Sequence, residues 1–321
     1  MHFEGSHPGA NDTPGADTIN FNLFGTGVHT ISPNTGLPNI TDQVTINGYS
    51  QPGASVNTLA KGTNAKLMIQ LYGAKILDES GGLYINAPDV VVRGLVINGF
   101  DHGIWVSSGA ANTKIVGNFV GTDPAGTQAP GNYTGVTISD NSGVASNTVG
   151  GSTPASRNLI SGNVYCGVCV SFGGNEVSGN LIGTQRDGKS PLGNSGDGVG
   201  VRSSDNIVGR AALGYANTIA FNGGDGVMIN GSNTVSNSIL SNSIFSNGSL
   251  GIDLVDAGIT PNDSGDADTG ANNLQNYPVI TSAKKASGQT TIKGKLNSTP
   301  KIPSRSSSSR TPRLQTGARR S

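Results

Sequence analysis

The stretch "NTVGGSTPASRNLISGN" (Asn147–Asn163) recurs as "NIVGRAALGYANTIAFN" (Asn206–Asn222), with Asn, Val, Gly, Asn, Ile and Asn at matched positions. A second pair of copies, "GNFVGTDPAGTQAPGN" (Gly117–Asn132) and "GNLIGTQRDGKSPLGN" (Gly179–Asn194), shows the same relationship. Asn, Gly and single apolar residues stay in place while the residues between them change. This pattern is typical of a repeat architecture, in which every repeat turns the chain at the same corners.

A shorter unit, Gly-apolar-x-apolar, recurs every 21 to 32 residues along the chain. Its copies are "GLYI" (82–85), "GIWV" (103–106), "GVTI" (135–138), "GVCV" (167–170), "GVGV" (198–201), "GVMI" (226–229) and "GIDL" (251–254). Two further short apolar runs, mostly opened by Asn, separate successive copies. Three short strands per turn with Gly and Asn at the corners predict an all-β right-handed parallel β-helix. A β-sandwich is the main alternative, but it does not explain copies related by whole turns.

The predicted β-helix stacks inward Val, Ile and Leu side chains from one turn onto the next, about 4.8 Å apart. In the opening stretch, Asn147 and Asn158 open the second and third strands, and Val149 and Ile160 enter the core. Asn side chains at equivalent corners are expected to form hydrogen-bonded ladders that satisfy exposed backbone groups. The fixed Asn and Gly residues therefore indicate corner structure, not catalysis.

The composition and charge of the chain argue against some classes of function. The chain has 321 residues, 49 of them Gly, and only 12% are charged. Residues 301–321 contain six Lys or Arg and no acid, which leaves 14 basic and 20 acidic residues elsewhere, a net charge of −6. An acidic body argues against nucleic-acid binding. No apolar run reaches the ~20 residues of a membrane helix.

The two cysteines form the sequence "CGVC" (166–169). Neither a second Cys/His pair nor a βα turn accompanies them, so a metal or redox motif is not indicated. Because residues three apart in one strand point to opposite faces, we expect two unpaired thiols.

Several motifs carry a family resemblance: "DTINFNLFGTGVHTI" (17–31), "RNLISGN" (157–163), "GNLIGT" (179–184) and "PNDSGDADTGANNLQNYPVI" (261–280). With these motifs the chain resembles bacterial right-handed parallel β-helix repeat proteins of the pectate-lyase-like superfamily. The resemblance implies a secreted or surface-attached protein and little about chemistry.

We expect four regions: a remnant of an N-terminal cap (1–16), the β-helix (17–283), the start of a truncated β module (284–300) and a disordered basic tail (301–321). Both ends depart from the family pattern, so we expect the chain to be a fragment, with the tail a frame-shift product or a basic segment that binds anionic surfaces. The start of the chain lacks the plan of a signal peptide, so either the protein is cytosolic or the chain is a fragment whose export signal lies upstream.

A first candidate site is the column of x residues in the Gly-apolar-x-apolar units, which should face outward. Its members are Tyr84, Trp105, Thr137, Cys169, Gly200, Met228 and Asp253. Trp105, the single Trp, and Tyr84 would offer aromatic faces to sugar rings. Asp101 and His102 directly precede the strand of Trp105, and His102 is a candidate general base. Alternatively, Trp105 packs under a loop and His102 is a solvated corner residue.

Two long loops, 121–134 and 183–197, should leave the same side of the solenoid two turns apart. Asp123 lies on one and Asp187 on the other, and they could frame a carbohydrate-binding groove beside the aromatic column. Asp123 aligns with Gln185, however, so the loops do not repeat a carboxylate. Arg93 is the only Arg within an apolar strand and a weak candidate for a base. Solvated loop and strand charges are the plainer interpretation of all three.

Asp263, Asp266 and Asp268 fall within six residues, and Gly265 and Gly270 allow the backbone to turn there. Such carboxylates can converge on a hard cation, so we predict a structural Ca²⁺ there, or else an Asx-rich loop without metal.

The sequence leaves open whether the protein is an enzyme. We expect an extracellular or cell-surface β-helix that serves as a structural or carbohydrate-binding module. A polysaccharide lyase or glycoside hydrolase acting in a surface groove is the alternative, and an adhesin is a third possibility. The expected partner is a polysaccharide or cell-surface glycan, bound by a monomer without a membrane span. Clustering of three or more carboxylates with a His or Arg in one groove would favour the enzyme.

Overall fold

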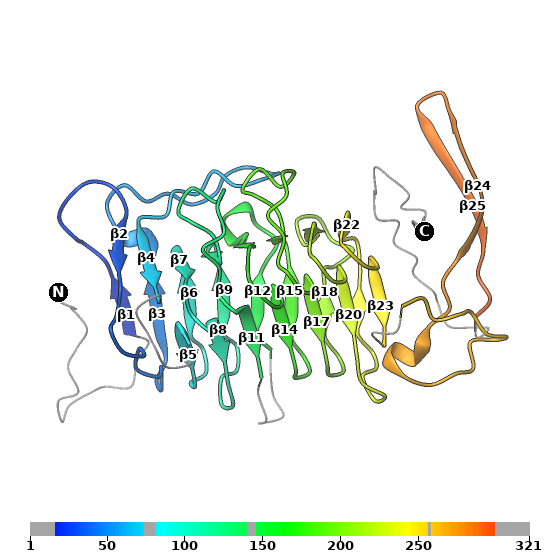
Figure 1. The fold of residues 1–321 in the computed structure, drawn as a ribbon, viewed down its shortest axis with the longest axis horizontal. Helices are drawn as coiled ribbons and strands as arrows, with labels where there is room; N and C mark the ends of the chain where they lie inside the picture. Colours follow the sequence, from blue (N-terminus) through cyan, green and yellow to red (C-terminus); the bar gives the residue numbers. More distant parts are fainter. Residues whose placement is uncertain (1–16, 74–80, 140–145, 256–257, 299–321) are drawn as a thin grey trace.

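The computed structural model describes residues 17–73, 81–139, 146–255 and 258–298. These residues wind into a right-handed parallel β-helix, as predicted, in which three strands per turn contribute to three parallel sheets (Figure 1). Helical segments in this part of the chain are short 3-10 turns, at Gly48–Ser50 (η1), Pro154–Ser156 (η2) and Ala271–Leu274 (η3). None of them is long or apolar enough to cross a lipid bilayer.

Sheet 1 is built from the Gly-apolar-x-apolar units. Along the solenoid it contains β5 (Leu83–Ile85), β8 (His102–Val106), β11 (Thr134–Ile138), β14 (Val168–Val170), β17 (Val199–Val201), β20 (Val227–Ile229) and β23 (Ile252–Leu254). Every pairing between neighbours in this sheet is parallel and in register, so equivalent residues of the repeats stack.

Sheets 2 and 3 contain the second and third strands of each turn. Sheet 2 holds β1 (Asp17–Asn20), β3 (Val44–Asn47), β6 (Val91–Arg93), β9 (Lys114–Val116), β12 (Thr148–Gly150), β15 (Glu176–Ser178), β18 (Ile207–Val208) and β21 (Ser238–Ile239). Sheet 3 holds β2 (His29–Ile31), β4 (Ile69–Tyr72), β7 (Leu95–Asn98), β10 (Phe119–Val120), β13 (Leu159–Ile160), β16 (Leu181–Ile182), β19 (Thr218–Ala220) and β22 (Ser243–Phe245).

The interior of the solenoid is a continuous apolar core. Val149 and Ile160, the two core positions of the opening stretch, are fully buried, as are their equivalents Val208 and Ile219 two turns later. Burial of such stacked side chains stabilises the fold by roughly 25 cal/mol per Å² of apolar surface.

Asparagine ladders occupy all three corners, which confirms the predicted role of these residues. The ladder between sheets 2 and 3 contains Asn118, Asn158, Asn180, Asn217 and Asn242, all buried. In each step one amide oxygen accepts hydrogen bonds from the backbone N–H and the side-chain Nδ2 of the preceding Asn; for Asn217 and Asn180 both distances are 3.0 Å. In this ladder every side-chain amide nitrogen also donates to a backbone carbonyl, so its buried polar groups are paired. In the ladder between sheets 1 and 2, the side-chain nitrogen of Asn237 has no hydrogen-bond partner among the described residues.

A second apolar layer covers the outer face of sheet 3. Val96, Phe119, Leu159 and Leu181 stack on that face and are buried beneath the 52–67 segment, which contributes Ala65 and Leu67. Figure 1 shows this segment running along the solenoid from the early turns to the loops of later ones. The Arg157 guanidinium donates hydrogen bonds to the carbonyls of Leu59, Ala60 and Gly62 at 2.9, 3.0 and 2.6 Å and holds the segment down.

The last described element is an antiparallel hairpin, β24 (Val279–Ala286) and β25 (Gln289–Lys295), that projects from the end of the solenoid (Figure 1). Its first strand begins at Val279, so the expected boundary at 283/284 falls inside β24. The expected cap remnant (1–16) and basic tail (301–321) lie outside the described residues.

Candidate functional site

The predicted outward column on sheet 1 exists in register. Tyr84 pairs with Trp105, and the column continues through Thr137, Cys169, Gly200, Met228 and Asp253. Tyr84 and Trp105 are partly exposed, whereas Thr137 and the members beyond it that carry a side chain are buried. The accessible aromatic surface of this column therefore lies on β5 and β8, at the N-terminal end of sheet 1.

Trp105 is the centre of a compact cluster. Its ring centroid lies 5.2 Å from that of Tyr84 and 4.4 Å from that of His102, and both ring pairs are tilted by about 50°. The indole Nε1 donates a hydrogen bond to the Ser139 hydroxyl. The hydrogen bond to Ser139 thus fixes one edge of the indole, and the indole rings lie beside the rings of Tyr84 and His102.

His102 is held on both ring nitrogens. Its Nε2 lies 3.2 Å from the Asp101 carboxylate and its Nδ1 lies 2.8 Å from the Thr137 hydroxyl. Burial lowers the pKa of His102, and the Asp101 charge offsets part of this effect by raising it. A carboxylate favours the neutral tautomer with the proton on Nε2, and Thr137 then donates to Nδ1.

This geometry restricts what His102 can do. Both nitrogens already have protein partners, so removal of a proton from a substrate requires the Thr137 contact to break first. The arrangement suits a fixed polar group beside an aromatic surface better than a free general base.

Sequence reasoning missed a second aromatic stack at the corner that leads into sheet 1. Tyr133 and Tyr165 stack with ring centroids 5.8 Å apart and an interplanar angle of 10°, and both are exposed. Arg202 donates a hydrogen bond of 2.8 Å to the Tyr165 hydroxyl. The available signal was their place one and two residues after the equivalent corner residues Asn132 and Asn163.

The corner stack adjoins the Trp105 cluster. Thr134 pairs with His102 across β11 and β8, so Tyr133, one residue earlier, lies beside Asp101. Tyr84, Trp105, Tyr133 and Tyr165 come from four successive turns, which spans roughly 14 Å along the solenoid. We call these four residues, together with Asp101 and His102, the aromatic platform.

The expectation of two unpaired thiols is wrong, because the structure joins Cys166 and Cys169 in a disulfide. The rule that residues three apart point to opposite faces holds only inside a strand, and β14 begins at Val168. Cys166 lies in the corner before the strand, and the two Cα atoms are 6.0 Å apart, within the usual range for a disulfide. The bond ties the corner of Tyr165 to sheet 1.

Asp123 and Asp187 lie away from the platform. Their loops fold over sheet 3, where Gly126 packs against Leu159 and Gly188 against Leu181. The two loops contact each other through a hydrogen bond of 3.0 Å from the Arg186 N–H to the Gly126 carbonyl. The two loops pack on the second apolar layer and do not frame a groove beside the aromatic column.

Arg93 also lies apart from the other candidates. It belongs to β6 of sheet 2, not to sheet 1, and its exposed side chain donates a hydrogen bond of 2.9 Å from Nε to Asn47. The structure therefore does not bring Arg93 together with Asp101 and His102.

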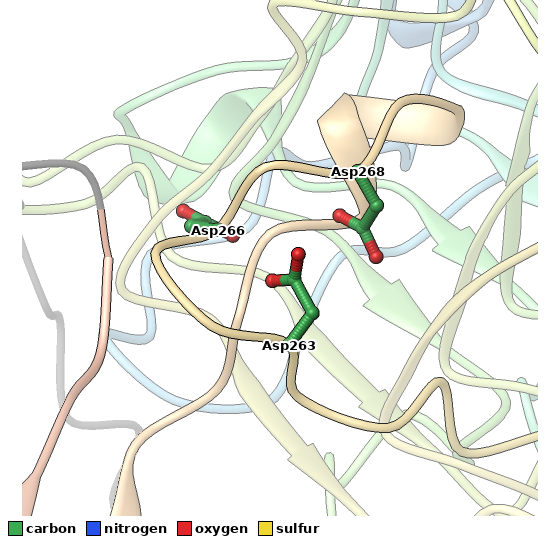
Figure 2. A group of neighbouring side chains, drawn as sticks. All are labelled: Asp263, Asp266 and Asp268. Carbon is green, nitrogen blue, oxygen red and sulfur yellow. The ribbon is translucent and has the colours of Figure 1, made fainter.

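The three aspartates of the predicted cation site do converge (Figure 2). Asp263, Asp266 and Asp268 each offer an oxygen within 4.8 Å of the others. Asp263 and Asp266 also hold the loop together: Asp263 accepts hydrogen bonds from Ala267 and Asn276, and Asp266 from Asn276 and Ser298. One buried oxygen of Asp268 has no hydrogen-bond partner among the described residues.

These features define a parallel β-helix with an aromatic platform on its lateral face. No model of a protein family matches the sequence, and no curated protein matches it significantly. Among solved structures, the chain is similar to a point mutant of the periplasmic alginate epimerase AlgG. The similarity covers 76% of this chain and 66% of the epimerase chain, at 17% sequence identity and a TM-score of 0.41.

Proposed function

We propose that this protein is a secreted or cell-surface β-helix repeat protein that binds a glycan along the aromatic platform. The observation that supports this most directly is the pairing of Tyr84 with Trp105 on adjacent turns, with both rings partly exposed. Aromatic faces bind the apolar faces of sugar rings, and a few fixed polar groups bind their hydroxyls. Asp101 and His102 supply such groups next to Trp105.

The disulfide supports the proposed location. Structural disulfides persist in oxidising compartments outside the cytosol. Cys166 and Cys169 are 2% and 6% exposed, so their bond is shielded from small-molecule thiols once formed.

The experiment is a depletion assay. The protein is incubated with a panel of insoluble neutral and acidic polysaccharides, and the free protein is measured. With a polysaccharide that retains the wild type, Trp105→Ala should weaken binding about tenfold or more. Phe24→Ala is the matched control, because Phe24 is fully exposed and lies on the loop before β2, away from the platform. Equal binding by wild type and Trp105→Ala excludes the platform as the site.

A polysaccharide lyase or hydrolase is the second candidate, favoured by the Asp101–His102 pair beside Trp105. Glycoside hydrolysis requires two carboxylates across the substrate. Within the described residues Asp101 is the carboxylate that contacts His102, and Asp123 and Asp187 lie over sheet 3. The same samples are assayed for unsaturated products and new reducing ends. If the wild type turns over a polysaccharide and His102→Gln does not, the protein is an enzyme. If the wild type is depleted by a polysaccharide without turnover, the result supports the binding module.

We also propose a structural Ca²⁺ at Asp263, Asp266 and Asp268. Three carboxylates can supply up to six oxygens, and Ca²⁺ binds six to eight. The unpartnered oxygen of Asp268, which lies next to the two other carboxylates, is the specific feature that supports a cation.

A further inference from the structure

The β24–β25 hairpin differs in charge from the rest of the protein. Residues 17–268 contain 10 Lys or Arg and 18 Asp or Glu, a net charge of −8. Residues 269–298 contain four Lys and no acidic residue, a net charge of +4. All four of these Lys residues lie on the hairpin, which projects away from the acidic solenoid (Figure 1).

The register of the hairpin sorts its side chains onto two faces. Ser282 pairs with Lys293, Lys284 with Thr291, and Val279 with Lys295. Because alternate residues of a strand share a face, Lys284, Lys293 and Lys295 lie together on one face. The opposite face carries Ile280, Ala283 and Ile292, with Lys285 as its single cation.

The three lysines form a dense cluster of positive charge. Neighbours two apart along a strand, or diagonal across the pair, are about 7 Å apart. Both strands are exposed to solvent, and neither contains a carboxylate that could neutralise the ammonium groups. Ser282, Thr291 and Gln289 add neutral hydrogen-bonding groups on the same face.

We propose that this lysine face binds an anionic polysaccharide, separately from the aromatic platform. Charge complementarity selects an anionic partner, and regularly spaced carboxylate or sulfate groups can contact all three lysines at once. Single-stranded nucleic acid is a poorer fit, because its sites add aromatic side chains for base stacking. The hairpin itself contains no aromatic residue.

The hairpin is anchored at its base to the end of the solenoid. Asn276 donates a hydrogen bond of 2.8 Å to the Asn297 carbonyl, and Ser298 donates one of 2.6 Å to Asp266. These contacts join the two ends of the hairpin to the loop that carries the aspartate cluster.

The test uses heparin as the anionic probe and the full chain with the six basic residues of 301–321 replaced by Gln. This background removes the charge of the C-terminal segment from the comparison. At about 50 mM NaCl, Lys284→Gln/Lys293→Gln/Lys295→Gln should raise the heparin Kd about tenfold or more, and added salt should abolish binding. The matched control Lys61→Gln/Lys66→Gln/Lys114→Gln removes the same charge from exposed positions of the solenoid and should change the Kd less than about twofold.

Three outcomes would overturn the proposal: no heparin binding by the background protein, equal weakening by both triple variants, or tighter binding to a DNA duplex than to heparin at the same salt concentration. The melting temperature of each variant verifies folding. Trp105 is intact in all these proteins, so any glycan binding at the aromatic platform contributes equally to every Kd. A difference between the variants therefore reports on the lysine face.

Discussion

Asp123 and Asp187 occupy different positions in two equivalent loops, yet their carboxylates accept hydrogen bonds from the same pair of loop amides. Asp123 Oδ1 accepts from the N–H groups of Thr127 and Gln128, each at 2.8 Å. Asp187 Oδ1 accepts from Lys189 and Ser190, the aligned residues, also at 2.8 Å. The loops thus repeat an interaction without repeating a residue, and the two acids act in loop structure.

Removal of either carboxylate should therefore affect stability and not glycan binding. We expect Asp123→Ala and Asp187→Ala each to lower the free energy of unfolding by about 1 kcal/mol, since two loop amides lose their acceptor. Urea titration measures the stability, and the depletion assay measures binding. If either variant binds glycan more weakly while its stability is unchanged, the mutated residue belongs to the binding site.

Arg157 should control the order of the 57–65 segment. Its guanidinium donates to three carbonyls of that segment and, at 3.2 Å, to Gly179, which makes the planar fork hard to replace. We expect Arg157→Lys to lower the free energy of unfolding by about 2 kcal/mol. Amide hydrogen exchange should accelerate selectively in residues 57–65. Arg210→Ala is the control, because Arg210 bonds to the Glu176 side chain and should leave exchange in this segment unchanged.

The disulfide should be detectable chemically. Without reductant, Cys166 and Cys169 should resist alkylation in the unfolded protein, and with reductant each should take one label, as measured by intact mass. Cys166→Ser/Cys169→Ser should lower stability by about 2 kcal/mol, the value expected for a loop of four residues. Two labels without reductant would show that the thiols are free.

His102 should make stability depend on pH. Its pKa is lowered in the folded protein, mainly by burial, so the unfolded chain binds more protons just below the ordinary value of 6.5. Stability should therefore fall as the pH decreases below about 6.5 and be constant above it. His102→Gln should remove this dependence. The pKa of Glu176 is also lowered, so Glu176 adds a loss of stability only as the pH falls below its ordinary value of 4.5.

Calcium should stabilise the C-terminal end of the solenoid. Addition of Ca²⁺ at 100 times its Kd should add about 2.7 kcal/mol of stability, and EDTA should reverse the rise in Tm. Asp268→Asn should abolish the response, whereas Asp187→Asn should retain it. A wild-type Tm that neither Ca²⁺ nor EDTA changes would exclude a structural cation here.

The architecture could be predicted because it depends on local periodicity. The Gly-apolar-x-apolar units became the strands of sheet 1, and Asn147 and Asn158 became members of corner ladders. The column from Tyr84 to Asp253 was predicted for the same reason, since parallel in-register pairing fixes which residues stack. The disulfide was missed because the point at which β14 begins decides the direction of Cys166, and that point is set by the corner.

The sequence by itself determined the number of strands per turn, the residues that fill the core and the alignment of the repeats, because each follows from alternation and from the backbone preferences of Gly and Asn. Only the tertiary structure decided which side chains meet across turns of unequal length. It placed Tyr133 beside Asp101, moved the loops of Asp123 and Asp187 over sheet 3, and separated Arg93 from His102. The physical reason is that loop direction depends on the apolar surface each loop can cover, and Phe119, Leu159 and Leu181 offered that surface on sheet 3.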